Sequence, residues 1–208
     1  MEFSEVIKRR RMMRAFTAEP LAEGTAERLL RAGNRAPSAG FSQGYSFLVL
    51  EGAKQAAPLW RVMWHAAADL TGEDAAYEAA QLRALEPAPL VIVPLASKDI
   101  YLDRYARGDK GWTDRDETRW PVPYWYIDTG FAALLILLAV VDEGLGAVLF
   151  GIPPEVMGEF RAEYGVPDEW TPIGAIAVGH SDPANDPVPP AKASDRKKLD
   201  ELVHRGRW

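Results

Sequence analysis

The chain lacks several residue types and patterns that would indicate particular chemistries. It contains no cysteine, so disulfides, thiolate metal ligands and cysteine nucleophiles are excluded, and we expect a protein of the reducing cytoplasm. It has only three histidines, whose spacing matches no metal-binding motif, so no metal site is predicted. A serine elbow of the form GxSxG is also absent, which leaves a hydrolytic triad without support.

Long hydrophobic runs and an excess of positive charge are missing as well. The longest apolar run, residues 131–141, is too short to cross a bilayer and indicates a buried helix or a helix at a dimer interface. The N-terminal residues are charged, unlike a signal peptide. The formal net charge is −6, which disfavours non-specific nucleic-acid binding. We therefore expect neither a membrane nor a nucleic acid as a partner.

What the chain does contain is enough apolar material for one globular domain. Of its 208 residues, 48% are hydrophobic, which supports a single core formed by residues 1–208. Helices and strands alternate without regular βαβ spacing, so the sequence predicts an α+β fold. The predicted helices are residues 2–11, 21–32, 54–68, 73–85, 124–143 and 153–164, and the predicted strands are 46–50, 89–95, 147–150 and 172–178.

Two segments do not follow a helical or strand period. Residues 98–123 are charged and aromatic, which predicts a lid or a substrate-pocket segment. Residues 181–208 are predicted to form a C-terminal arm, with a final strand or helical turn at 195–203. Within the strand at 89–95, Pro94 argues against a central position at that end, because proline cannot donate to a ladder.

Two basic clusters stand out in this acidic chain. Five cations lie within residues 8–14, and at helical spacing Arg10 and Arg14 share one face. Two guanidinium groups on one face favour an anion between them, and a phosphate monoester matches their geometry. A second cluster, Arg196 to Lys198, lies near the C-terminus. Either cluster could instead be a solvated charge run at a helix end or chain end.

A short stretch rich in small and polar residues joins a predicted helix to a predicted strand. It reads "RAPSAGFSQGYSF" over residues 35–47. Its serines and glutamine offer side-chain donors, and its glycines permit close approach of the backbone to a ligand. It could equally be an ordinary helix-to-strand connection.

Taken in order, five motifs resemble the flavin-dependent nitroreductase family over nearly the whole chain. They are "RRMMRAF" at 10–16, "APSAGFSQGYSF" at 36–47, "EGLG" at 143–146, "IAVGH" at 176–180 and "RKKLDELVHRGRW" at 196–208. The resemblance implies an α+β fold with a central, mostly antiparallel sheet flanked by helices. It also implies a homodimer whose terminal arms wrap the partner, with non-covalent FMN at the interface and NADPH or NADH as the electron donor.

The resemblance also assigns roles to residues. The two basic clusters would hold the FMN phosphate together, while the loop after residue 35 and the end of the strand at 147–150 would contact the flavin ring. Residues from the 98–123 region would line the substrate pocket, and no residue is required as a dedicated acid or base. The implied FMN contacts are Arg10, Arg11, Arg14, Pro37, Ser38, Ala39, Phe41, Gln43, Leu149, Phe150, Gly151, Arg196 and Lys197, and the implied substrate contacts are Trp112, Trp120 and Tyr124.

Five positions depart from the family pattern. Met12 replaces a small residue, Gly44-Tyr45 replaces Pro-Trp, and Gly151 stands where a glutamate is frequent. Phe41 replaces an asparagine, a change that resembles the branch whose enzyme fragments reduced flavin with oxygen. The expected activity is ping-pong reduction of an electron-poor small molecule such as a nitroaromatic or a quinone. Flavin fragmentation, reductive dehalogenation and flavin binding without turnover stay open as alternatives.

Overall fold

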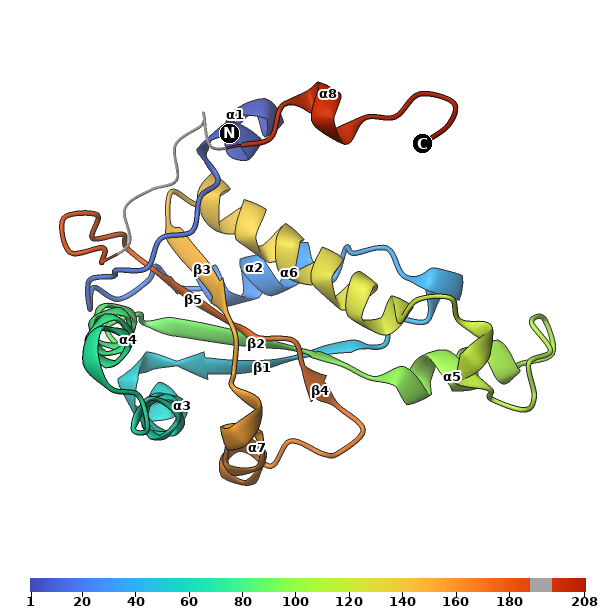
Figure 1. Cartoon of the computed structure of the whole chain (residues 1–208), viewed down its shortest axis with the longest axis horizontal. Helices are drawn as coiled ribbons and strands as arrows, with labels where there is room; N and C mark the ends of the chain where they lie inside the picture. The colour runs from blue at the N-terminus through green and yellow to red at the C-terminus, as the bar shows by residue number, and fades with distance from the viewer. Residues whose placement is uncertain (188–195) are drawn as a thin grey trace.

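An antiparallel sheet lies between two layers of helices in the computed structural model, which describes residues 1–187 and 196–208 (Figure 1). The strand order is β1-β2-β5-β3, and the short β4 pairs with one end of β2. The strands are β1 (Tyr45–Glu51), β2 (Leu90–Ala96), β3 (Gly146–Phe150), β4 (Thr171–Pro172) and β5 (Ala175–Gly179). Every strand pairing is antiparallel, which confirms the predicted α+β class.

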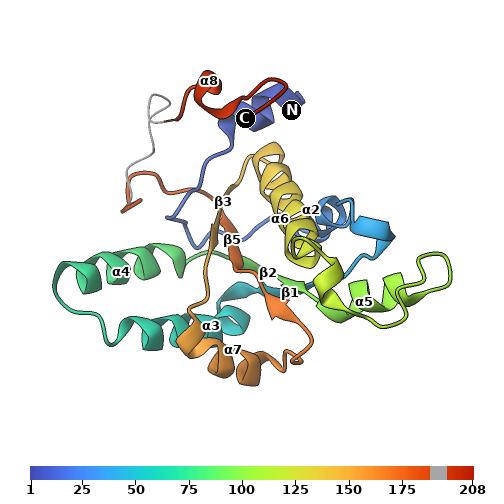
Figure 2. The same cartoon turned by 45° about the vertical axis from the view of Figure 1, so that its right-hand side comes forward.

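The helices cover both faces of this sheet. Helices α2 and α6 pack on one face, and α3, α4 and α7 pack on the other (Figure 2). Alternation along the strands supplies both cores: Val91 and Val93 face α3, while Leu90 and Ile92 face α6. The α-helices are α1 (Phe3–Arg9), α2 (Thr25–Gly33), α3 (Gly52–Ala67), α4 (Gly72–Leu85), α5 (Lys98–Ala106), α6 (Tyr124–Asp142), α7 (Met157–Tyr164) and α8 (Leu199–Leu202).

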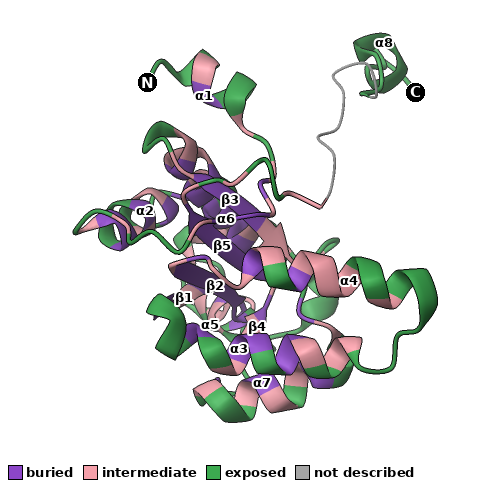
Figure 3. Ribbon diagram, turned by 90° about the vertical axis from the view of Figure 1, so that its left-hand side faces the viewer, coloured by how far each residue is buried: buried purple, intermediate pink, exposed green. Residues whose placement is uncertain are grey.

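The strand that contains Pro94 is central, so the expectation of a peripheral position was wrong. The whole of β2 is buried between β1 on one side and β5 with β4 on the other (Figure 3). On the second side β5 pairs only with residues 90–92 and β4 only with 95–96, so Pro94 falls in the gap between the two partners. The predicted strand at 172–178 is divided between β4 and β5 at Gly174, which has a φ of 143°.

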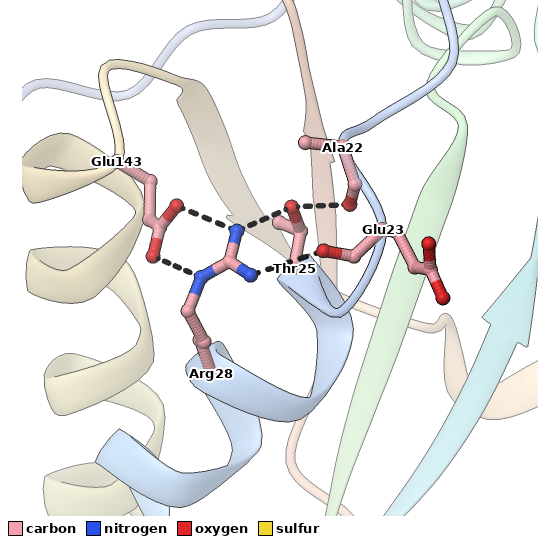
Figure 4. A network of polar contacts seen from close by, with 5 residues as sticks. All are labelled: Ala22, Glu23, Thr25, Arg28 and Glu143. Carbon is pink, nitrogen blue, oxygen red and sulfur yellow. Dashed lines mark hydrogen bonds and ion pairs between the residues drawn. The ribbon is translucent and has the colours of Figure 1, made fainter.

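Helix α6 is the longest element and spans the sheet. Its glycine-rich end behaves as predicted, because Gly144 adopts a left-handed conformation with a φ of 76° after the last turn. Arg28 of α2 fixes this end by donating two hydrogen bonds to the carboxylate of Glu143, at 2.7 and 2.9 Å (Figure 4). By length and composition alone α6 could cross a membrane, but eight of its side chains are buried against the rest of the chain.

The segment at 98–123 is more regular than the sequence suggested. It begins with α5 and contains a 3₁₀ turn at Glu117–Arg119. The helix was missed because its buried side chains are few, Tyr101 and Leu102, and its other faces carry charge. Helix α8 confirms a helical turn within 195–203, while residues 188–195 of the predicted arm lie outside the described residues. Helices α1 and α8 both stand away from the sheet on the same side (Figures 1 and 3).

Candidate functional site

The arginines of the first basic cluster lie on an extended segment instead of a helix. Helix α1 ends at Arg9, and Met12 forms a parallel bridge with Ala147 of β3. The predicted helical face shared by Arg10 and Arg14 was therefore wrong. In extended backbone, however, alternate residues point the same way, so the two arginines still share a side of the segment.

The guanidinium groups of Arg10 and Arg14 have no acidic partner in the described part of the chain, although the Arg14 backbone N–H donates to a carboxylate oxygen of Asp186 at 3.0 Å. Lys8 and Arg9 make weak surface pairs with Glu5, whereas neither Arg10 nor Arg14 makes a side-chain ion pair with a described residue. The Arg11 Nε donates to the Met13 sulfur at 3.2 Å. Two half-exposed guanidinium groups without a carboxylate form a local positive charge that an anion can neutralise.

The loop at 36–44 forms a tight turn with an unusual backbone. Gly40, Phe41 and Gln43 have φ values of 60°, 54° and 52°, in the left-handed region that non-glycine residues rarely occupy. The Gln43 N–H donates to the Ser38 hydroxyl oxygen at 2.9 Å, and the Ser42 hydroxyl donates to the Ala39 carbonyl at 2.6 Å. The turn exposes Phe41, whose side chain is 76% accessible.

Sequence reasoning missed the residue that anchors this turn. Asp128 is 3% exposed on α6, and its Oδ2 accepts hydrogen bonds from the Ala39 N–H at 2.8 Å and the Tyr101 hydroxyl at 2.7 Å. A signal was available, because an aspartate within a strongly apolar helix requires a hydrogen-bonding partner. Burial, and then the bond to Asp128, raises the pKa of Tyr101, so the phenol keeps its proton.

The end of β3 supplies the third group of predicted contacts. Leu149 and Phe150 pair with β5, and Phe150 stacks on Trp60 with ring centroids 5.7 Å apart. A Cβ added at Gly151 would meet no atom within 4 Å, so the backbone there faces open space.

The three predicted substrate contacts belong to one aromatic cluster. Trp112, Trp120 and Tyr124 pack together with Tyr105, at centroid distances of 4.5 to 5.6 Å. Trp120 also lines a surface cleft of about 680 Å³. Its buried indole N–H has no hydrogen-bond partner among the described residues. Packing explains much of this cluster, and its role toward a substrate stays a prediction.

Within one chain the arginines and the 38–43 turn do not meet. The turn at 38–43 is anchored at Asp128, near the first turn of α6, while the N-terminal amine donates to Asp142 at its last turn. The 14 residues between these anchors correspond to about 21 Å of helix. Arg10–Arg14 therefore lie at the opposite end of α6 from the loop (Figure 1). Arg196 and Lys197 are exposed, and no contact with this cluster is seen among the described residues.

An apolar stripe runs along α6 between the two ends. Ile127, Phe131 and Leu134 are 38 to 46% exposed, and Leu138 and Val141 continue the stripe as half-buried residues. The spacing alternates between four and three residues, which is the pattern of a helix that packs against another helix. We call these five residues the α6 seam.

Comparison with known proteins assigns the chain to a family. Residues 7–180 match the model of the nitroreductase family. A curated protein of Archaeoglobus fulgidus, provisionally named NADH dehydrogenase/NAD(P)H nitroreductase, is 23% identical over 100% of this chain and 99% of its own length. The nitroreductase CinD from Lactococcus lactis, solved with chloramphenicol, is 20% identical with a TM-score of 0.74, covering 98% of this chain and 99% of its own. Iodotyrosine deiodinase, solved with FMN and 3-iodo-L-tyrosine, is 20% identical with a TM-score of 0.68, covering 99% and 100%.

Proposed function

Because the chain belongs to the nitroreductase family, we propose that it is an FMN-dependent oxidoreductase that uses NADH or NADPH to reduce an electron-poor small molecule, such as a nitroaromatic or a quinone. Membership supports the oxidoreductase class, and the name of the Archaeoglobus relative supports the electron donor. The FMN in the deiodinase structure supports the cofactor. A cytoplasmic location stays a prediction.

The residues present fit FMN. The guanidinium groups of Arg10 and Arg14 have no ion-pair partner among the described residues and suit a phosphate, and the exposed Arg196 and Lys197, just before α8, add positive charge. Gly151 leaves open space where a planar ring could approach the backbone. When bound, the flavin would supply the redox chemistry by accepting a hydride from the donor and passing two electrons to the substrate.

The observation that carries this proposal is the division of the predicted site between the two ends of α6, with an apolar seam between them. In a two-fold dimer whose axis crosses the seam at a right angle, the two α6 helices pack antiparallel along it. The loop at 38–43 of one chain then lies at the same end as Arg10 and Arg14 of its partner. We infer that two such composite FMN sites form in a homodimer.

The chain's own residues would bind and orient the reactants without transferring a proton themselves. The arginines would hold the phosphate, and the 38–43 turn would border the ring. The aromatic cluster at Trp112, Trp120 and Tyr124 would limit which planar substrates stack there and would exclude water from the ring.

Spectroscopy of the purified protein tests the proposal. We expect flavin absorbance bands, anaerobic bleaching by NADH or NADPH, and return of the oxidised spectrum when a nitroaromatic or a quinone is added. A protein that retains flavin but is bleached by neither donor would contradict the enzyme assignment and favour flavin binding without turnover.

Reductive dehalogenation is the second candidate, because the deiodinase shares the fold over the whole chain. Adding 3-iodo-L-tyrosine to the reduced protein distinguishes the two. Iodide release with reoxidation of the flavin would favour dehalogenation, while formation of dimethylbenzimidazole in air would favour flavin fragmentation.

A further inference from the structure

One face of α5 packs against the turn that would border the flavin. Tyr101, Arg104 and Tyr105 have the i, i+3, i+4 spacing of a single helical face. A Cβ at Gly44 would lie 2.4 Å from the Tyr101 ring, and a Cβ at Gly40 would lie 2.7 Å from the Tyr105 ring. The Arg104 Nε donates to the Gly40 carbonyl at 2.9 Å. The departure from the family at Gly44 is thus explained, since Tyr101 occupies the space that a larger residue would need.

A single carboxylate oxygen ties this face of α5 to the turn and to α6. The Asp128 Oδ2 accepts from the Tyr101 hydroxyl of α5 and from the Ala39 N–H of the turn. Because the group is buried, neither bond is readily replaced by water. Asp128 therefore joins three elements that are distant in sequence.

The conformation that these contacts hold is one that the turn would not favour alone. Phe41 and Gln43 have left-handed backbone although neither is glycine, and such residues persist where the surroundings over-determine them. The contacts with Asp128, Arg104 and Tyr105 are those surroundings. Their effect is to present Ser38, Phe41 and Gln43 in one fixed arrangement.

We propose that Asp128 is a positioning residue for the flavin, which holds the Ser38–Gln43 turn in its binding conformation through the Ala39 N–H and the Tyr101 hydroxyl. This inference rests on the proposed function, because FMN is the group that the turn would contact. Asp128 itself is buried behind the turn and acts only through it.

Two substitutions and a matched control test this role in the full-length protein. Asp128→Asn keeps the size of the side chain but replaces a charged acceptor with a weaker neutral one. Tyr101→Phe removes one of the two donors. The control is Thr129→Val, which alters a buried polar residue on the same helix whose hydroxyl donates only to Trp125 of its own helix.

Three measurements separate positioning from general stability. We expect FMN to bind about tenfold more weakly to Asp128→Asn, the factor for weakening a hydrogen bond to a charged group, with a smaller loss for Tyr101→Phe. The visible circular dichroism of the bound flavin should change in both variants. Hydrogen exchange of the amides at 39–43 should become faster in both, while Thr129→Val matches the wild type in all three measurements.

The outcomes distinguish this inference from the proposed function. A wild-type protein that binds no FMN contradicts the function and overturns the flavin role of Asp128 with it. If the wild-type protein binds FMN, but flavin dichroism and amide exchange are unchanged in Tyr101→Phe and Asp128→Asn, the inference alone is overturned. If Asp128→Asn does not fold, Tyr101→Phe decides by the same criteria.

Discussion

The two ends of α6 are prepared for a ligand in different ways. At its N-terminal end the turn at 38–43 is held by side chains of α5 and α6, down to a buried carboxylate. At its C-terminal end Arg10 and Arg14 lie on an extended segment and have no described acidic partner for their guanidinium groups. One end is thus preorganised by its own chain, while the positive charge at the other end is available to bind an anion. A single chain therefore carries both halves of the proposed site but cannot join them.

The largest effect should come from separating the two chains. Leu134 lies at the middle of the α6 seam, so Leu134→Glu would place a charge on each side of the proposed two-fold contact. We expect a monomer whose affinity for FMN is lower by at least about a hundredfold, because each composite site then lacks one of its halves. Sedimentation and FMN titration measure both properties.

The control for the seam is Tyr77→Glu. Tyr77 is 51% exposed on α4, in the helical layer on the other face of the sheet, so its replacement should leave mass and FMN affinity unchanged. A Leu134→Glu monomer that binds FMN as tightly as the wild type would contradict a site divided between two chains, because each chain would then hold a whole site.

A smaller effect is expected at the arginine end. Arg10→Ala should weaken FMN binding by about 1.5–3 kcal/mol, through loss of a charge-assisted contact with the phosphate. Riboflavin, which has no phosphate, should bind the variant and the wild type equally. Fluorescence titrations with both ligands provide the measurement, and Arg9→Ala, at the surface-paired neighbour, is the control. Equal weakening for riboflavin would argue against a phosphate role.

The smallest effect concerns the framework that holds the arginine end in place. The bond from Arg28 lowers the pKa of Glu143, so this carboxylate stabilises the folded state while it is ionised. That contribution is present above its unfolded pKa of about 4.3 and is lost as the pH falls through the lower folded value. Glu143→Gln should therefore lower the melting temperature slightly at neutral pH and have little effect at strongly acidic pH. An equal loss at both pH values would contradict this origin.

Elements with a strong period could be predicted from the sequence. The apolar repeats of α3 and α6, the run at β2 and the left-handed Gly144 all matched, because local pattern and burial agree there. Helix α5 could not be predicted, since its buried face is complementary to a turn some 60 residues away. The position of the strand at Pro94 was predicted wrongly, because the gap between β4 and β5 that accommodates the proline depends on the tertiary pairing.

The resemblance implied both the set of site residues and a cofactor shared between two chains, and both stay predictions. Motif order alone implied that the two arginines and the loop at 36–44 contact one ligand. The structure places them at opposite ends of α6 in one chain, where the anchors Asp128 and Asp142 are separated by about 21 Å of helix. Asp128 was missed because a lone acid in an apolar run has many possible partners, and its partners here come from two other elements.

The separation imposed by α6 has a genetic consequence. If each site takes its loop from one chain and its arginines from the other, a chain defective at Asp128 and a chain defective at Arg10 are not equivalent when mixed. One of the two sites in such a heterodimer would contain both defects and the other would contain neither. Two damaged alleles could then restore one intact centre between them, an intragenic complementation that two copies of either allele cannot provide.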